Sequence, residues 1–555
     1  MKIITFLFLC MLSLNLSTLF YAQNFAILNA NEIEVKTTNN HTLFIQATST
    51  PEYYRFPSNF ASPPIYSSLL TISSYDSTTN WQRYLPLHFG CDFYCYDFYP
   101  GPLSLDGSRE RVHGNDSMKF EKVWKVTDTD INNFLAAYYA GGSTFANYSI
   151  PTDILTWPVH GPVGFDQNLS EFHDMNGDGK YNPYHGDYPK IKGTQYLRWI
   201  YTDGNVSELS NMGLEFRVSM FACTGNTMNS PLNRSVFVEY EIINRNSYYY
   251  KDFRVGLVNS FMIGCHKNDN FRSNALANAI QNYNSNTYFN ACDESQYAPH
   301  LNMVQGVGLI AVNNSQEPKL ASSLLNIRFN EGLQDGILIT ANLFNYHNAK
   351  FKNGVPVTFG NLGYDTSNTL LSKYMFPGNS DPNNWGTDGI QAPYTWTYEN
   401  YNNTQSELTP SSSYDFINSG PFKLGPNEKI KLAFVYVTTQ DSTLNSEELL
   451  ELNANQIIEM RTQYQNNQLA CAASILDMQE QVQVAPNAFP NPTDGLIRIS
   501  SPTPIKQIRI MGISGSEIMS CKTCNEIDLQ LLRPGIYMME YESEGQKFVE
   551  KIIKK

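Results

Sequence analysis

The chain has 555 residues with 38 basic and 52 acidic side chains, which give it a formal net charge of −14. Because nucleic-acid binding needs a basic face that neutralises phosphates, this charge excludes a nucleic-acid binder. Aromatic residues make up 13% of the chain, a content that excludes a disordered protein. Beyond the extreme N-terminus no apolar run approaches the roughly 20 residues that span a bilayer, so we expect no transmembrane segment in the mature chain.

The first 22 residues are typical of a secretory signal peptide. Lys2 supplies the positive start, residues 3–20 are apolar apart from small polar side chains, and Ala22 is a small residue at the cleavage position. The polar interruptions disfavour a retained membrane helix. Cys10 lies inside the apolar run rather than at its end, which disfavours lipid attachment. We therefore expect cleavage after Ala22 and an exported mature chain.

Eight cysteines remain after that cleavage. They are Cys91, Cys95, Cys223, Cys265, Cys292, Cys471, Cys521 and Cys524. In an exported chain an even number permits disulfides but does not fix their pairing. The two close pairs are Cys91 with Cys95 and Cys521 with Cys524, and we predict a local disulfide in each. The flanks of the second pair look like strands, which argues against a thioredoxin-like redox role.

Apolar residues alternate with polar ones along most of residues 23–440. Three segments with this pattern are 214–220, 236–242 and 430–436, and a period of two predicts half-buried β-strands. Clusters of Asn, Ser, Gly and Pro between such segments predict turns and loops. We expect a mainly β fold with a large, multi-lobed, β-sandwich-like body. The length of this region favours two packed β lobes over one, but the sequence does not show where one lobe would end and the other begin.

One long helix is expected after the body, within residues 441–470. Asn445 or Ser446 can cap it, and the acidic Glu447 and Glu448 suit its first turn. Apolar side chains share one face of this helix, namely those of Leu450, Ile457, Met460 and Tyr464. A linker over residues 471–484 follows, and it separates the body and its helix from a C-terminal unit.

Residues 485–555 are predicted to form a small Ig-like β-sandwich. The segment opens with Phe-Pro-Asn-Pro-Thr-Asp-Gly at residues 489–495, contains a Gly-x-x-Gly turn at 512–515 and a Pro-Gly-Ile-Tyr segment at 534–537, and ends in a basic strand. These motifs, in this order, make it resemble the type A C-terminal sorting domain of the type IX secretion system. The alternative is a plain Ig-like adhesion module.

The resemblance implies a destination and a set of partners. It implies export across both membranes of a Gram-negative cell by the type IX secretion machinery, after a signal peptide has directed the chain across the first. The product would then be secreted or placed at the outer-membrane surface, where a cell-surface glycolipid is a candidate anchor.

An acidic loop over residues 174–182 is a candidate calcium site. Asp174, Asn176 and Asp178 stand at loop positions one, three and five, and Gly179 and the carbonyl of Lys180 follow at six and seven, as in loops that wrap Ca²⁺. The twelfth position, where an acid normally completes the shell, is a histidine, and Asp187 two residues later is the substitute. The alternative is an Asx-rich turn that its own hydrogen bonds hold. No helix pair flanks the loop, so a structural ion suits it better than a switching EF-hand.

Motifs around this loop resemble those of a large group of secreted proteins that carry sorting domains. They are Phe-Tyr-Pro-Gly-Pro at 98–102, Lys-Val-Trp-Lys-Val at 122–126, Trp-Pro-Val-His-Gly at 157–161, Gly-Asp-Tyr-Pro at 186–189 and Ser-Gly-Pro-Phe at 419–422. The resemblance covers most of residues 25–440, but the group has no assigned activity. Two departures from its pattern, at Thr194 and over residues 259–270, make a second calcium site doubtful.

No catalytic residue can be assigned from the sequence. His160, His173 and His185 lie close together in the chain but lack the helical spacing of zinc ligands, and the motifs of common hydrolases and nucleotide-binding proteins are absent. We therefore expect a calcium-stabilised, exported protein with a binding, adhesion or structural role. The alternative is an extracellular, carbohydrate-active hydrolase, because two carboxylates can cleave glycosides without any sequence signature.

Overall fold

The chain folds into two compact units, residues 1–474 and 475–555. The computed structural model describes residues 25–39, 42–44, 53–58, 63–85, 98–203, 211–263, 269–284, 302–313, 320–326, 342–361, 363, 369–398, 414–469, 471, 487–489, 491–500, 505–512, 516–543 and 546–555. The expected signal peptide, the Cys91 and Cys95 pair and nearly all of the expected linker lie outside these residues.

Nine antiparallel strands of the first unit form one large sheet, called sheet A here. Its main order is β1-β2-β4-β5-β14-β19-β18, and β3 and β6 also pair with β5. The strands are β1 (Phe25–Leu28), β2 (Glu34–Thr38), β3 (Thr42–Leu43), β4 (Tyr53–Arg55), β5 (Ile65–Asp76), β6 (Gln82–Tyr84), β14 (Tyr250–Phe261), β18 (Ser322–Asn326) and β19 (Tyr414–Leu424).

Nine further antiparallel strands form sheet B. Its main order is β15-β16-β17-β20-β13-β12-β11-β7, and β8 pairs with β11. The strands are β7 (Tyr99–Pro100), β8 (Trp124–Thr127), β11 (Gln195–Thr202), β12 (Leu214–Ala222), β13 (Ser235–Asn244), β15 (Asp269–Asn274), β16 (Ala279–Asn284), β17 (Met303–Val312) and β20 (Lys429–Gln440). The three strands expected at 214–220, 236–242 and 430–436 are thus present as β12, β13 and β20.

Sheets A and B share one hydrophobic core. The same cluster of buried side chains contains Tyr54 and Val255 from sheet A and Phe216 and Phe434 from sheet B. Both sheets therefore belong to a single compact body, and the mainly β fold expected from the alternating pattern is confirmed.

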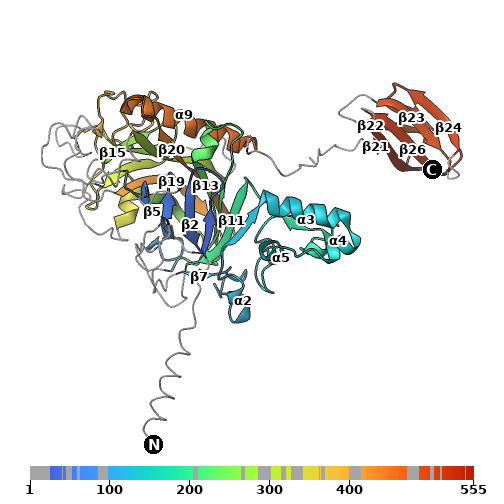
Figure 1. The fold of residues 1–555 in the computed structure, drawn as a ribbon, viewed down its shortest axis with the longest axis horizontal. Coiled ribbons are helices and arrows are strands. Elements are labelled where there is room, and N and C mark those ends of the chain that lie inside the picture. The colour runs from blue at the N-terminus through green and yellow to red at the C-terminus, as the bar shows by residue number, and fades with distance from the viewer. Residues whose placement is uncertain are drawn as a thin grey trace, which may run out of the picture. The chain divides into compact units, whose positions relative to one another are not determined.

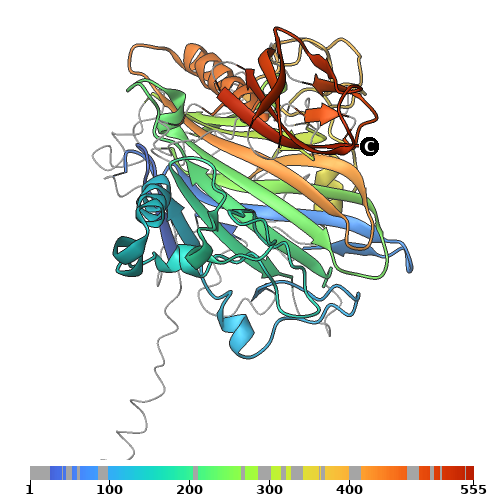
Figure 2. The ribbon, with the colours of Figure 1, turned by 90° about the vertical axis from the view of Figure 1, so that its right-hand side faces the viewer.

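Helices cover the other face of sheet B. The helix α9 (Ser446–Gln465) lies against β16, β17 and β20, and the group of α3 (Asp128–Ala140), α4 (Gly142–Ala146) and α5 (Thr152–Leu155) lies beside β8 and β11 (Figures 1 and 2). A second hydrophobic cluster joins these helices to the sheet through side chains such as Phe134, Phe221 and Ile457. As a result β12 is buried on both faces along its whole length, although the alternation of its residues predicts that only one face is buried.

The remaining elements of the first unit are short. They are α2 (Asn115–Met118), α7 (Leu343–His347), the 3₁₀ turns η1 (Pro183–His185) and η2 (Pro231–Arg234), and the paired strands β9 (Phe172–His173) and β10 (Tyr188–Pro189). Among the described residues no helix is long and apolar enough to cross a membrane.

The helix expected within residues 441–470 is α9, and its cap is Asn445. The Asn445 side chain accepts a hydrogen bond of 3.0 Å from the backbone N–H of Glu448, whose carboxylate accepts one of 2.9 Å from the N–H of Asn445. This reciprocal capping box shows that the N-cap residue is Asn445 and not Ser446. The helix α3 was not expected, although Thr127 and Asp130 form the same kind of capping box at its start.

The second unit consists of two small antiparallel sheets on a core of their own. The first is β21-β22-β25 and the second β24-β23-β26-β27. The strands are β21 (Asn487–Phe489), β22 (Leu496–Ser500), β23 (Ile505–Met511), β24 (Glu517–Lys522), β25 (Glu526–Asp528), β26 (Gly535–Ser543) and β27 (Gln546–Lys554). The predicted disulfide between Cys521 and Cys524 is present in this unit.

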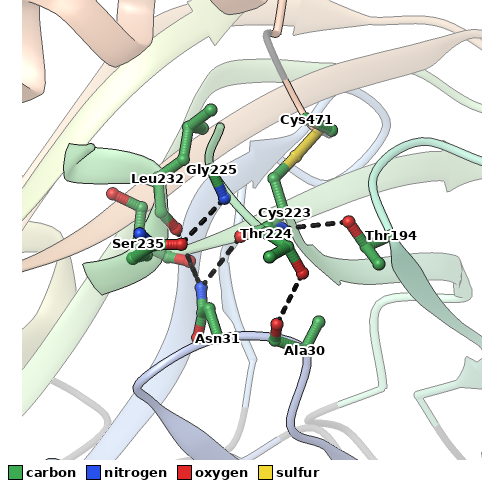
Figure 3. Close-up of a disulfide and its surroundings, with 10 residues drawn as sticks. Ala30, Asn31, Thr194, Cys223, Thr224, Gly225, Leu232, Ser235 and Cys471 are labelled. Atoms are coloured by element: carbon green, nitrogen blue, oxygen red, sulfur yellow. Dashed lines mark hydrogen bonds between the residues drawn. A yellow bond between two sulfur atoms is a disulfide. The ribbon is translucent and has the colours of Figure 1, made fainter. Parts of the chain in front are cut away.

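A disulfide that the spacing of cysteines did not predict joins Cys223 to Cys471, with 4.8 Å between their Cα atoms (Figure 3). It attaches the chain after α9 to the end of β12. The N-terminal segment meets the same place, because the Asn31 amide donates to the carbonyls of Leu232 and Ser235, each at 2.9 Å. Three segments that are distant in the sequence are therefore held together beside sheet B.

Candidate functional site

The acidic loop is closed by its own carboxylates. The two oxygens of Asp174 accept backbone hydrogen bonds from Gly177 at 2.8 Å and Gly179 at 2.7 Å, and Asp178 accepts one from Lys180 at 2.7 Å. The Asn176 side chain donates to Asp178 at 2.9 Å. The structure thus brings together the residues expected at loop positions one, three, five and seven, in an exposed turn.

Asp187 lies beneath this loop and fastens its two ends. Its side chain is fully buried. One carboxylate oxygen accepts from the N–H of Met175 at 2.9 Å, and the other accepts from the N–H of Asn182 at 2.8 Å. One oxygen therefore binds the backbone at the start of the loop and the other binds it at the end. In this geometry Asp187 acts as a clasp for the loop, and its role as a substitute calcium ligand stays a prediction.

The three histidines near the loop have separate partners. His160 accepts from the backbone N–H of Tyr181 through Nε2 at 3.0 Å and contacts the carbonyl of Gln167 through Nδ1 at 2.7 Å, so its proton lies on Nδ1. The ring of His173 stacks on Tyr188 with 4.5 Å between centroids. Within the described residues no three His, Cys, Asp or Glu side chains are grouped closely enough to hold a metal ion.

A polar pocket of about 450 Å³ lies where the ends of β13 and β19 meet the start of β20. Its wall is formed by Asp166, Glu241, Ile243, Arg245, Asn313, Phe422, Lys423, Leu424, Asn427, Glu428, Lys429 and Ile430. The pocket therefore combines carboxylates, cationic side chains and one aromatic ring, and we take it as the candidate site.

Two arginines bind carboxylates of this pocket, Arg245 in its wall and Arg217 next to it. Arg217 and Arg245 each donate to one oxygen of the fully buried Glu215, at 2.7 and 2.8 Å. Both also contact the same oxygen of Asp166, at 2.6 and 3.2 Å. Arg217 lies 3.4 Å from Glu241 as well. The register explains this arrangement, because Arg217 on β12 is directly opposite Glu241 on β13 and both point to the same face of sheet B.

These contacts keep the pocket carboxylates ionised. Burial opposes ionisation, but hydrogen bonds from Arg217 and from the backbone N–H of Asn168 lower the pKa of Asp166 to about 2. Burial also opposes the ionisation of Glu241, yet the charges of Arg217, Lys431 and Lys429 lower its pKa to about 2. A general acid needs a raised pKa, so neither group can hold a proton for a leaving group near neutral pH.

A second pair of carboxyl groups is buried between sheets A and B. Asp269 and Asp415 are 6% and 1% exposed. Burial raises the pKa of Asp415 to about 8. Burial also raises the pKa of Asp269 well above its ordinary value, and the charge of Asp415 adds to this effect. Neither residue was singled out by the sequence, because a buried acid on a strand carries no local motif.

The pocket residues were also missed, although one signal was present. Glu215 and Arg217 occupy the polar positions of the alternating segment 214–220, and Glu239 and Glu241 do so in 236–242. Facing positions of two adjacent strands with opposite charge indicate a charged surface on the sheet. The pairing of those strands could not be read from the sequence, so the convergence of these side chains on Asp166 was hidden.

Comparisons with known proteins identify the C-terminal unit. Residues 487–555 match the family model of the secretion system C-terminal sorting domain. This match confirms the resemblance of residues 485–555 to a type IX sorting domain. The chain therefore carries the domain that the type IX secretion machinery handles, which implies export to the cell surface or secretion.

The comparisons are less informative about the body. No curated protein matches the chain. Among solved structures, a polysaccharide lyase is similar with a TM-score of 0.17 and 7% sequence identity, over 65% of this chain and 35% of that one. The chain spans about a third of the length of that structure, and a likeness of this kind carries no argument about activity.

Proposed function

We propose that this chain is exported in two steps and acts outside the cell as a binding, adhesion or structural protein. A signal peptide cleaved after Ala22 starts the route, and the sorting domain completes it through the type IX secretion machinery. The product is either released or held at the outer surface by a glycolipid anchor. The observation that carries this proposal is the sorting-domain match at residues 487–555.

The pocket supports binding more strongly than catalysis. Two of its three carboxylates, Asp166 and Glu241, are ionised and paired with arginines, and the exposed Lys423 and Lys429 stand at its edge. Such a site suits a ligand with polar or charged groups. The runner-up is a carbohydrate-active hydrolase, which is favoured by the presence of three carboxylates, Asp166, Glu241 and Glu428, in the wall of one pocket. The low pKa values of Asp166 and Glu241 weigh against it.

Calcium stabilisation of the body remains part of the proposal. The spacing of Asp174, Asn176 and Asp178 and the positive φ of Gly179 support an ion in the acidic loop. The alternative is that the loop's internal hydrogen bonds suffice. Thermal unfolding of the purified body with Ca²⁺ and with a chelator separates the two, and an unchanged midpoint would defeat calcium stabilisation.

Export is tested by removing residues 485–555 and following the protein in cell fractions. We expect the truncated chain to stay inside the cell envelope, whereas the full chain reaches the surface or the medium. A reporter fused to residues 485–555 provides the complementary control and should be exported. Undisturbed export of the truncated chain would refute the proposal.

Ligand binding is tested by incubating the body with a panel of glycans and peptides. Lys423→Ala at the pocket edge should weaken the binding of a genuine pocket ligand several-fold, whereas Lys119→Ala just after α2 should leave it unchanged. Release of cleaved product from any member of the panel would favour the hydrolase over the binding protein.

A further inference from the structure

Asp269 and Asp415 each connect sheet A with sheet B. Asp269, the first residue of β15 in sheet B, accepts a hydrogen bond of 3.2 Å from the backbone N–H of Ile263, just after β14 of sheet A. Asp415 on β19 of sheet A accepts one from the side-chain amide of Asn282 on β16 of sheet B. Sheet B supplies the accepting carboxylate in the first contact and sheet A supplies it in the second.

The strand register places four polar side chains at this position. Asn282 is directly opposite Phe271 on β15, so Asp269, two residues before Phe271, lies on the same face and diagonal to Asn282. In sheet A, Asn259 on β14 is directly opposite Asp415. We call Asp269, Asn282, Asn259 and Asp415 the inter-sheet polar cluster. Two of its members belong to each sheet.

This cluster has unused bonding capacity. The Oδ1 atoms of Asp269 and Asp415 and the Nδ2 atom of Asn259 are buried and have no hydrogen-bond partner in the described structure. Asn259 is 0% exposed and Asp415 is 1% exposed. An unsatisfied buried polar group destabilises the fold, and native proteins rarely retain several at one place unless water or an ion binds there.

The chemistry of the free atoms points to a cation. Among the ion pairs of the described residues none includes Asp269 or Asp415, so no cationic side chain there favours their ionised forms, and burial raises the pKa of both. A cation that binds both groups would displace their protons. The unused acceptors are carboxylate oxygens, which hard cations such as Ca²⁺ prefer. The Asn259 oxygen accepts a hydrogen bond of 2.7 Å from the Ser68 hydroxyl. An amide can exchange its oxygen and nitrogen positions, and after this exchange the Asn259 nitrogen would donate to Ser68, whose hydroxyl can turn to Tyr436, while the oxygen would face the cluster.

We propose that the inter-sheet polar cluster binds a hard divalent cation of the Ca²⁺ class, which bridges Asp269 and Asp415 and joins sheet A to sheet B. Water fills the remaining positions of the six to eight that Ca²⁺ takes. The inference goes beyond the acidic loop, since it places an ion inside the body, and it does not depend on the export route.

Unfolding of the mature full chain in Ca²⁺ and in EGTA tests this site against the acidic loop. The double variant Asp269→Asn/Asp415→Asn keeps the shape of both side chains, and Asp174→Asn/Asp178→Asn is the matched control in the loop. We expect Ca²⁺ to raise the midpoint of the wild type by several degrees and that of the cluster variant by clearly less, with the acidic loop accounting for any rise that remains; the loop variant should keep the share of the rise that the cluster supplies. A wild type that ignores Ca²⁺, or a cluster variant that responds as the wild type does, would overturn the proposal.

A direct measurement on the wild type keeps the test decisive should the cluster variant fail to fold. Crystals of the unmodified protein soaked in Tb³⁺, a Ca²⁺ substitute, should give an anomalous peak about 2.3–2.6 Å from oxygens of both Asp269 and Asp415. A peak at the acidic loop without one between the sheets would reject the inter-sheet site and would leave the calcium loop standing.

Discussion

Cys223 and Cys471 are joined by a disulfide although 248 positions separate them in the sequence. Cys223 directly follows β12 in sheet B, and Cys471 comes a few residues after α9. The backbones also meet, because Gly225 and Cys471 form an isolated β-bridge. The bond therefore fixes the chain after α9 to the end of β12 in sheet B.

Removing this disulfide should destabilise the body. Cys223→Ser/Cys471→Ser frees a long closed loop in the unfolded chain, and a native disulfide of this kind contributes about 2–4 kcal/mol. We expect the free energy of unfolding of the body, measured by urea denaturation, to fall by that amount.

The second disulfide supplies the control. Cys521→Ser/Cys524→Ser changes only the C-terminal unit and should leave the unfolding of the body unchanged. Equal stability of the Cys223→Ser/Cys471→Ser variant and the wild type would contradict the structural role of the long-range bond.

The two disulfides also illustrate what the sequence can and cannot predict. The pair Cys521 and Cys524 is local, so spacing alone suggested it. The pair Cys223 and Cys471 depends on the position of α9 against sheet B, which no local pattern encodes. Alternation predicted the strands β12, β13 and β20, but it could not predict the charged pocket. Alternation is a local property, whereas the pocket depends on which strands become neighbours.

Acid should weaken the pocket network. The folded pKa values of Asp166 and Glu241 are about 2, below their ordinary values of 3.8 and 4.5. Their stabilising effect is therefore complete above about pH 4.5 and is lost as the pH falls toward 2, with roughly 2 kcal/mol from each. We expect the free energy of unfolding to fall across this window when measured by urea denaturation at several pH values.

Neutral variants provide the comparison. Asp166→Asn and Glu241→Gln should each lower the stability at pH 7 and flatten the acid-dependent loss. Glu451→Gln, on an exposed position of α9, should change neither. An acid-dependent loss of the same slope in the two pocket variants would show that other carboxylates cause it.

The clasp formed by Asp187 can be separated from the acidic loop itself. Asp187→Asn leaves one acceptor oxygen for two backbone N–H groups, and an unpaired buried donor costs about 1–3 kcal/mol. We expect lower stability and faster hydrogen exchange at the amides of Met175 and Asn182. Asp178→Asn, an exposed change in the same loop, should leave these two amides protected. Unaltered exchange in Asp187→Asn would refute the clasp.

The acidic loop shows that residue spacing can predict the shape of a loop without deciding which chemistry the loop serves. The spacing of Asp174, Asn176 and Asp178 predicted a curled loop, and the structure has one. The same oxygens that would bind Ca²⁺ also accept backbone hydrogen bonds, because both tasks favour the same residue types at the same spacing. The role of Asp187 could not be predicted, since it depends on how deeply the following turn is buried.

Gly186 holds the turn after the acidic loop against α3. Its φ is +98°, and a β-carbon at this position would come within 2.4 Å of the Tyr138 ring. Gly186→Ala should therefore cost about 3 kcal/mol in unfolding free energy, from backbone strain and from the clash. Gly177→Ala has a similar φ of +73° but open space around it, so it should cost only about 1 kcal/mol. In the double variant Gly186→Ala/Tyr138→Ala the clash is absent. Its loss of unfolding free energy should therefore be smaller than the sum of the losses of the two single variants. Full additivity would show that the contact between the turn and α3 is not the cause.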